Sequence, residues 1–173
     1  MNPIVVSRRI FAHYHMGIHV THLIKSAVFA AGVLLSSTLA ANAASINLGI
    51  SNISLKPINF YGAPSCTNCT LSHIAVDIQP YSGDVSTATS TAGATSMTYI
   101  ISYYGTYQFG TQFVQKGCRA TITAELTGGK ITTVTSAGWA PFVGNPTCST
   151  ISDPQIDGAG NVSWAVRLTA TGS

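Results

Sequence analysis

The strongest constraint on this chain is the regular alternation of apolar and polar residues in short segments. Residues 118–126 carry five apolar side chains at alternate positions, with arginine, threonine and glutamate between them. Residues 162–168 repeat the pattern with valine, tryptophan and leucine. A period of two places every apolar side chain on one face of an extended strand. Because no stretch after residue 43 has a sustained helical period, the sequence predicts an all-β fold.

Further strands are expected in several segments rich in β-branched and aromatic residues. They are residues 46–50, 53–55, 74–78, 97–109, 130–136 and a last one near 150–156. About seven short strands separated by Gly, Pro and Asn are typical of a single antiparallel β-sandwich, Ig-like or fimbrial-subunit-like, with a closed barrel as the alternative. Residues 82–96 contain almost only small side chains, which favours a Ser/Thr-rich loop over a weak strand.

The N-terminal segment has the organisation of a secretory signal. Lys25 precedes an uncharged and mostly apolar run at residues 26–40, and Ala41-Asn42-Ala43 follows as an A-x-A cleavage motif. We therefore expect a signal peptide over residues 1–43 and a single mature domain over 44–173.

Two alternatives concern the same segment. Met16 would give a leader of conventional length, so translation could begin there. An uncleaved membrane anchor competes with the cleaved signal, but Ser36, Ser37 and Thr38 interrupt an apolar run that must reach about 20 residues to span a bilayer.

The positive charge of the chain resides in this leader. The whole sequence has a net charge of +3, whereas five basic and five acidic residues balance after Ala44. A protein without a basic patch cannot neutralise phosphates, which argues against nucleic-acid binding. A surface poor in charge and rich in hydroxyls resists association weakly, so it suits a protein that packs against a neighbour, a cell surface or a polysaccharide.

Four cysteines offer three interpretations. Cys66 and Cys69 form a C-x-x-C motif, but a strand pattern follows it where a redox motif needs a helix. Cys118 and Cys148 are too far apart to form the second half of a zinc knuckle. In an exported chain with an even number of cysteines, structural disulfides are the favoured interpretation, with no metal and no cofactor.

The pairing follows from the expected hairpin. The strand at 118–126 turns at 127–129 and returns through 130–136, so that residues 137–138 should lie beside Cys118. Ten further residues can bring Cys148 back to Cys118. The predicted pairs are Cys118–Cys148 and Cys66–Cys69, against two crossed alternatives.

The aromatic residues of segment 97–109 suggest a binding face. Tyr99, Tyr103 and Tyr107 occupy odd-numbered positions, which share one face of a regular strand, whereas Tyr104 lies on the opposite face. This ladder is either part of the core or a half-exposed platform that stacks on sugar rings or on a protein, because a buried tyrosine hydroxyl needs a partner. Trp139, in an expected loop, is a second candidate for an exposed aromatic residue. Trp164 is expected in the core.

Catalysis has little support in the sequence. His73 is the one histidine after the leader, and Asp77, four residues later on an expected strand, would lie about 13 Å away. The remaining carboxylates are Asp84, Glu125, Asp153 and Asp157. A small hydrolase that pairs two of these carboxylates is therefore the third-ranked hypothesis.

The leading hypothesis is a secreted, periplasmic or cell-surface protein with a non-enzymatic role in structure or surface assembly. Its partners would be further copies of itself or another surface protein. The alternative is an extracellular module that binds a carbohydrate or another ligand, such as a polysaccharide, through Tyr99, Tyr103, Tyr107 and Trp139. Neither hypothesis includes nucleic acid or a membrane span after signal cleavage.

Overall fold

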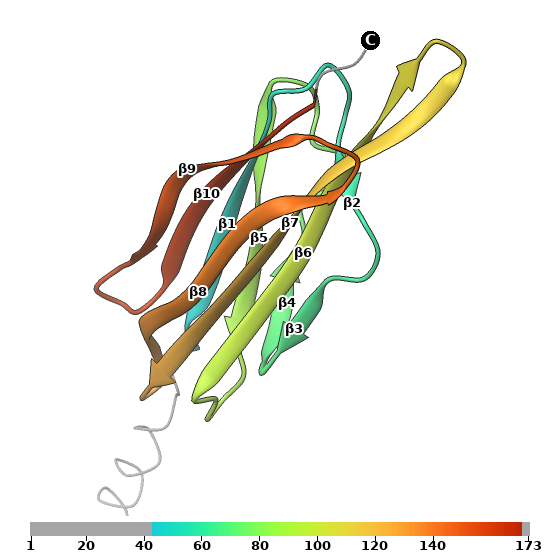
Figure 1. Ribbon diagram of the computed structural model, residues 1–173. Helices are drawn as coiled ribbons and strands as arrows, with labels where there is room; N and C mark the ends of the chain where they lie inside the picture. Colours follow the sequence, from blue (N-terminus) through green and yellow to red (C-terminus); the bar gives the residue numbers. More distant parts are fainter. Residues whose placement is uncertain (1–42, 171–173) are drawn as a thin grey trace, which may run out of the picture. The chain divides into compact units, whose positions relative to one another are not determined.

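The computed structural model describes residues 43–170, which form ten strands in two mostly antiparallel sheets and no helix (Figure 1). This confirms the predicted all-β class. Residues 1–42, with the predicted signal peptide and the alternative start at Met16, lie outside the described residues, as do 171–173. No helix long and apolar enough to cross a membrane occurs within residues 43–170.

Sheet 1 has the strand order β4-β5-β1-β10-β9. Sheet 2 has the order β2-β6-β7-β8, and β3 also pairs with β6. The strands of sheet 1 are β1 (Ser45–Asn52), β4 (Cys69–His73), β5 (Ser82–Ser90), β9 (Thr147–Ile156) and β10 (Val162–Thr169). Those of sheet 2 are β2 (Asn59–Phe60), β3 (Ser65–Thr67), β6 (Ser96–Phe109), β7 (Gln112–Thr127) and β8 (Lys130–Val143).

The first and last strands of the described chain pair with each other at the centre of sheet 1. β1 runs parallel to β10, with Ile46 opposite Val162 and Asn52 opposite Leu168. On its other side β1 pairs antiparallel with β5. The alternation seen in the sequence explains which side chains point inward, but it contains no information about this strand order.

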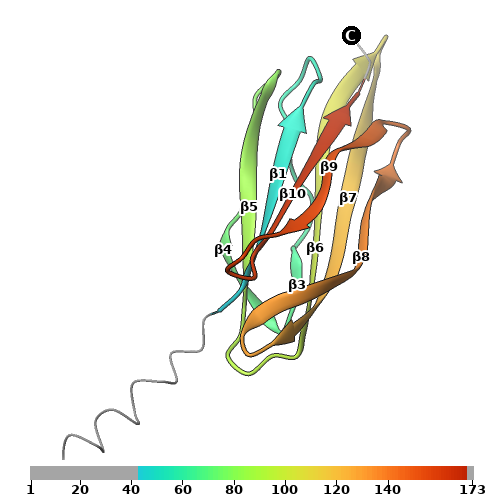
Figure 2. The ribbon, with the colours of Figure 1, turned by 90° about the vertical axis from the view of Figure 1, so that its left-hand side faces the viewer.

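The core lies between the two sheets, which face each other as layers (Figure 2). β1 and β10 bury every second side chain, as their alternating sequences predict. Trp164 is among these buried residues, as expected. The two layers are consistent with a β-sandwich.

Residues 82–90 correct the prediction of a Ser/Thr-rich loop over 82–96. They form β5, which pairs with β1 on one side and β4 on the other. Ser86, Ala88 and Ser90 point inward and are buried. Small residues on this strand leave room for large side chains of the opposite sheet, so the segment has a packing role despite its low hydrophobicity. The connection to β6 is confined to residues 91–95.

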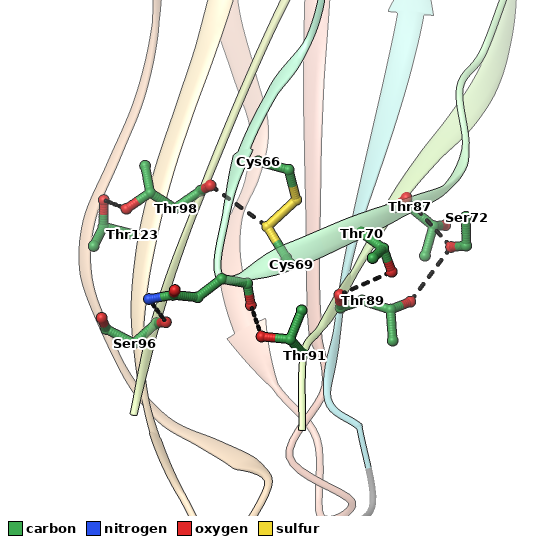
Figure 3. The surroundings of a disulfide bond; sticks show 11 residues. Cys66, Cys69, Thr70, Ser72, Thr87, Thr89, Thr91, Ser96, Thr98 and Thr123 are labelled. Atoms are coloured by element: carbon green, nitrogen blue, oxygen red, sulfur yellow. Dashed lines mark hydrogen bonds between the residues drawn. A yellow bond between two sulfur atoms is a disulfide. The ribbon is translucent and has the colours of Figure 1, made fainter. Parts of the chain in front are cut away.

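Each of the two disulfides joins one sheet to the other. Cys66 in β3 is bonded to Cys69 in β4, where the chain crosses between the sheets at Asn68 (Figure 3). Cys118 in β7 is bonded to Cys148 in β9. β4 and β9 are the two edge strands of sheet 1, so both edges of that sheet are attached covalently to sheet 2. The presence of two disulfides indicates an oxidising, extracellular type of environment.

These pairs are the ones that the hairpin argument predicts, but one premise of that argument was wrong. Cys118 lies opposite Pro141, not beside residues 137–138. Three register shifts between β7 and β8 insert extra residues into β8, which continues as a strand to Val143. β-Bulges of this kind leave no clear mark in an alternating sequence.

The two disulfides should contribute unequally to stability. The Cys118–Cys148 bond closes a separation of 30 residues. Its removal by Cys118→Ala and Cys148→Ala should lower the free energy of unfolding by about 3–4 kcal/mol, because the unfolded chain regains loop entropy. Removing the Cys66–Cys69 bond, with a separation of three residues, should cost about 1–2 kcal/mol. Urea unfolding of the two double variants measures both values, and an equal or reversed order would contradict the loop-entropy explanation.

Candidate functional site

The predicted tyrosine platform is buried. Tyr99, Tyr103 and Tyr107 have exposed fractions of 0% and point from β6 into the core. The prediction that these residues form a binding face is therefore wrong. For Tyr99 and Tyr103 the physical reason is β5, whose small residue Ser86 lies across the core beside them.

The hydroxyl of Tyr103 is satisfied inside the core by a closed ring of three hydrogen bonds. Ser86 Oγ lies 2.6 Å from Tyr103 Oη, which donates to the carbonyl of Ala75 at 3.3 Å. The N–H of Ala75 donates to Ser86 Oγ at 2.8 Å. Burial raises the pKa of Tyr103, and it raises the pKa of Tyr99 to about 12, with the Ser86 hydroxyl offsetting part of each effect. Both tyrosines are therefore residues of the core.

Trp139 is also buried, with 9% of its surface exposed. It lies within β8, and its indole Nε1 donates to the backbone carbonyl of Arg167 in β10 at 2.8 Å. The expectation of an exposed aromatic residue in a loop was wrong because the strand continues past Pro141. Trp139 instead connects the two sheets.

The polar residues considered for catalysis are dispersed. His73 Nε2 lies 3.8 Å from Asp84 Oδ1, and both side chains are exposed. β4 ends at His73, so Asp77 lies in the following loop, with a φ of 49°. Within residues 43–170 no three His, Cys, Asp or Glu side chains are placed to hold one metal ion.

Asp157 has a structural role in the turn between β9 and β10. Its Oδ1 accepts the backbone N–H groups of Ala159 at 2.9 Å and Asn161 at 2.8 Å. These hydrogen bonds, with that from the Asn161 side chain, lower the pKa of the carboxyl. Such an Asx-type arrangement stabilises a turn.

A cluster of aromatic side chains that the sequence analysis did not identify lies on the outer face of sheet 2. The ring of Tyr61 is 5.3 Å from that of Tyr104, edge to face, and 5.2 Å from that of Phe142. The guanidinium carbon of Arg119 lies 5.3 Å from the centroid of Phe142. We call Tyr61, Tyr104, Phe142 and Arg119 the aromatic row. It spans β6, β7, β8 and the segment after β2.

The aromatic row depends on Gly117 and on a β-bulge beside it. Gly117 in β7 lies opposite Tyr104 and Val143, while Cys118 lies opposite Pro141, so Phe142 is the extra residue of the bulge. A Cβ on Gly117 would come within 2.5 Å of the Phe142 ring and 2.9 Å of Tyr104 Cβ. Only glycine therefore allows the two side chains to lie across this strand.

A shallow cavity of about 230 Å³ adjoins the row at Tyr104. Its lining is both polar and apolar and consists of Lys56, Pro57, Asn59, Tyr104, Gly105 and Thr106. The N–H of Asp77 donates to Asn59 Oδ1 at 2.7 Å, which fixes that side chain. An aromatic cluster beside a side-chain amide that is held in place makes this part of sheet 2 the candidate ligand site.

A second candidate feature is β1 itself. Ile46, Leu48 and Ile50 are fully buried, whereas the residues between them are small or polar. The strand is held at its start by Asn161 Oδ1, which accepts from Ser45 N at 3.0 Å. At its end the Asn52 amide donates to the carbonyls of Lys56, Ile78 and Gln79.

The sequence matches no protein-family model, and no curated protein matches it. The aromatic row was missed by sequence reasoning because its members are far apart in the chain. The available signals were Tyr104 on the polar face of its strand and Gly117 within an otherwise regular strand.

The hydrogen-bond ring predicts a specific effect of removing one hydroxyl. Tyr103→Phe leaves the Ala75 carbonyl without its donor inside the core, which should cost about 1–3 kcal/mol of unfolding free energy. Tyr104→Phe, one residue away but on the outer face, should stay within about 0.5 kcal/mol of the wild type. Urea unfolding compares the two, and equal losses would show that the ring contributes nothing.

The buried tyrosines also predict loss of stability at alkaline pH. An unfolded tyrosine releases its proton near pH 10, whereas folded Tyr99 holds it to about pH 12. Above pH 10 the unfolded state binds fewer protons, so stability should fall as the pH rises toward 12. Unfolding midpoints at pH 9, 10 and 11 measure this slope. Tyr99→Phe should reduce it, and an unchanged slope would contradict the assignment to Tyr99.

Proposed function

We propose that the protein is an exported, non-enzymatic subunit of a surface assembly, in which β1 of one copy completes sheet 1 of another. The observation that carries this proposal is the position of β1. It lies at the centre of its sheet, yet it begins directly after the predicted signal peptide. Its one covalent connection to the other strands leaves from Asn52.

Burial supports the proposal because it gives β1 a large share of the sheet's stability. Full burial of Ile46, Leu48 and Ile50 contributes about 1.5–3 kcal/mol each. A copy whose own β1 was displaced would expose the hydrogen-bonding edges of β5 and β10 together with an apolar groove. Such edges recruit a further strand.

The contacts at both ends of β1 support a defined register for an exchanged strand. Asn161 binds the backbone and side chain of Ser45, and the Asn52 amide binds three carbonyls in the loops beyond the strand. An identical strand from a second copy would find the same partners, which is why swapping an element between copies has a low thermodynamic cost.

Two further features support export and close association. The predicted signal peptide and the disulfides favour a secreted, periplasmic or cell-surface location. Balanced charge and a surface rich in hydroxyls oppose association only weakly. The proposal needs no cofactor and no metal.

The pairing of Gly49 with Ala165 allows a direct test. A Cβ on Gly49 would lie 3.8 Å from the Cβ of Ala165, which is close to the usual spacing in a disulfide of about 3.8 Å. Gly49→Cys and Ala165→Cys are placed in separate copies, which are unfolded, mixed and refolded under oxidising conditions. If β1 is exchanged, the two variants should form a covalent dimer, seen by non-reducing electrophoresis and mapped by mass spectrometry.

Controls separate strand exchange from chance cross-linking. Both substitutions in one chain should give an internal bond in unexchanged copies, and each variant mixed with wild-type protein gives the background. A mixture that stays monomeric, without the 49–165 linked peptide, would exclude strand exchange.

A further inference from the structure

We infer that the aromatic row on sheet 2 is a binding site for an acidic polysaccharide, whose sugar rings stack on Tyr61, Tyr104 and Phe142 and whose carboxylate binds Arg119. This site lies on the outer face of sheet 2. It does not depend on the exchange of β1, which belongs to sheet 1.

The three rings form a partly accessible aromatic surface. Tyr61 is 47% exposed, and Tyr104 and Phe142 are half-buried. The Tyr61 ring contacts both of the others, with its centroid 5.3 Å from that of Tyr104 and 5.2 Å from that of Phe142, so the three rings form one continuous cluster. The C–H faces of pyranose rings are apolar and pack well on aromatic rings of this kind.

Polar groups beside the rings favour a saccharide over a purely apolar ligand. Three residues with polar side chains, Lys56, Asn59 and Thr106, line the adjoining cavity. Because Asn59 Oδ1 already accepts the N–H of Asp77, the Asn59 amide nitrogen is the group that can donate to a ligand. Sugar hydroxyls need such donors and acceptors at the edge of a stacking surface.

Arg119 is the residue that favours an acidic saccharide. Its side chain is held by the Phe142 ring on one side, and its Nε donates to Ser102 Oγ at 3.0 Å. Arg119 is exposed and forms no ion pair with any residue of the 43–170 region. An arginine held in this way can donate a bidentate hydrogen bond from its terminal nitrogens to a carboxylate. Lys56 places a second positive charge at the other end of the row.

Polygalacturonate, a polymer of uronic acid, is the test ligand, and neutral dextran is the comparison. Affinity electrophoresis should show that polygalacturonate retards the native protein and that dextran does not. Arg119→Gln should weaken retardation about tenfold or more, as expected for loss of a charge-assisted hydrogen bond. Tyr61→Ala should also weaken it, by loss of stacking.

Matched variants distinguish this site from general effects of charge and aromaticity. Lys130→Gln removes the same charge at the opposite end of β7 and β8, and Tyr81→Ala removes a tyrosine that is 66% exposed but outside the row. Both should bind as the wild type does, and melting temperatures verify that every variant is folded. The inference is overturned if polygalacturonate does not retard the wild type, if dextran retards it equally, or if Lys130→Gln weakens binding as much as Arg119→Gln. None of these outcomes bears on the cross-linking test of β1.

Discussion

The parallel pairing of β1 with β10 is the contact on which the rest of the structure depends. It joins the first and last strands of the described chain, and it places both at the centre of sheet 1. Sheet 1 is therefore complete only when β10 has been synthesised. Contacts between such distant segments close slowly because the loop entropy is lost before the contact is gained. A sheet assembled in this way benefits from covalent attachment, and the disulfides provide it at both edges.

Composition and packing are linked through β5. Tyr99 and Tyr103 project from β6 into the core, where the facing strand β5 carries small serine and alanine side chains that leave space for their rings. Serine contributes more than small size, since Ser86 forms hydrogen bonds with Tyr103 and with the N–H of Ala75. In the sequence, the abundance of small hydroxyl residues looks like low complexity. In β5, however, these residues are needed because the core contains tyrosine side chains.

The sequence predicted those features that depend on one strand or one hairpin. Alternation identified the all-β class and the inward position of Trp164, and chain length around the hairpin indicated the disulfide pairs. Prediction from the sequence failed where the burial of a side chain depends on a strand from another part of the chain. Whether Tyr103 is buried depends on β5, whose own pattern is weak, and whether Trp139 is exposed depends on how far β8 continues. The members of the aromatic row come from segments that only the folded sheet brings together.

The register shifts between β7 and β8 show how a fold acquires an exposed site without losing core residues. In a regular hairpin, side chains alternate, and neighbouring residues on β8 would face opposite sides. Here the extra residue at the Gly117 bulge is Phe142, which lies on the outer face, while Trp139 remains buried against Arg167 of the other sheet. One inserted residue therefore adds an aromatic ring to the outer surface and leaves the inner packing intact.

The same shift that places Pro141 opposite Cys118 also brings Phe142 to the position where its ring lies close to both Arg119 and Tyr61. Bulges near functional sites commonly redirect a side chain in this manner, and the position of this bulge is an independent structural reason to look for a ligand on sheet 2.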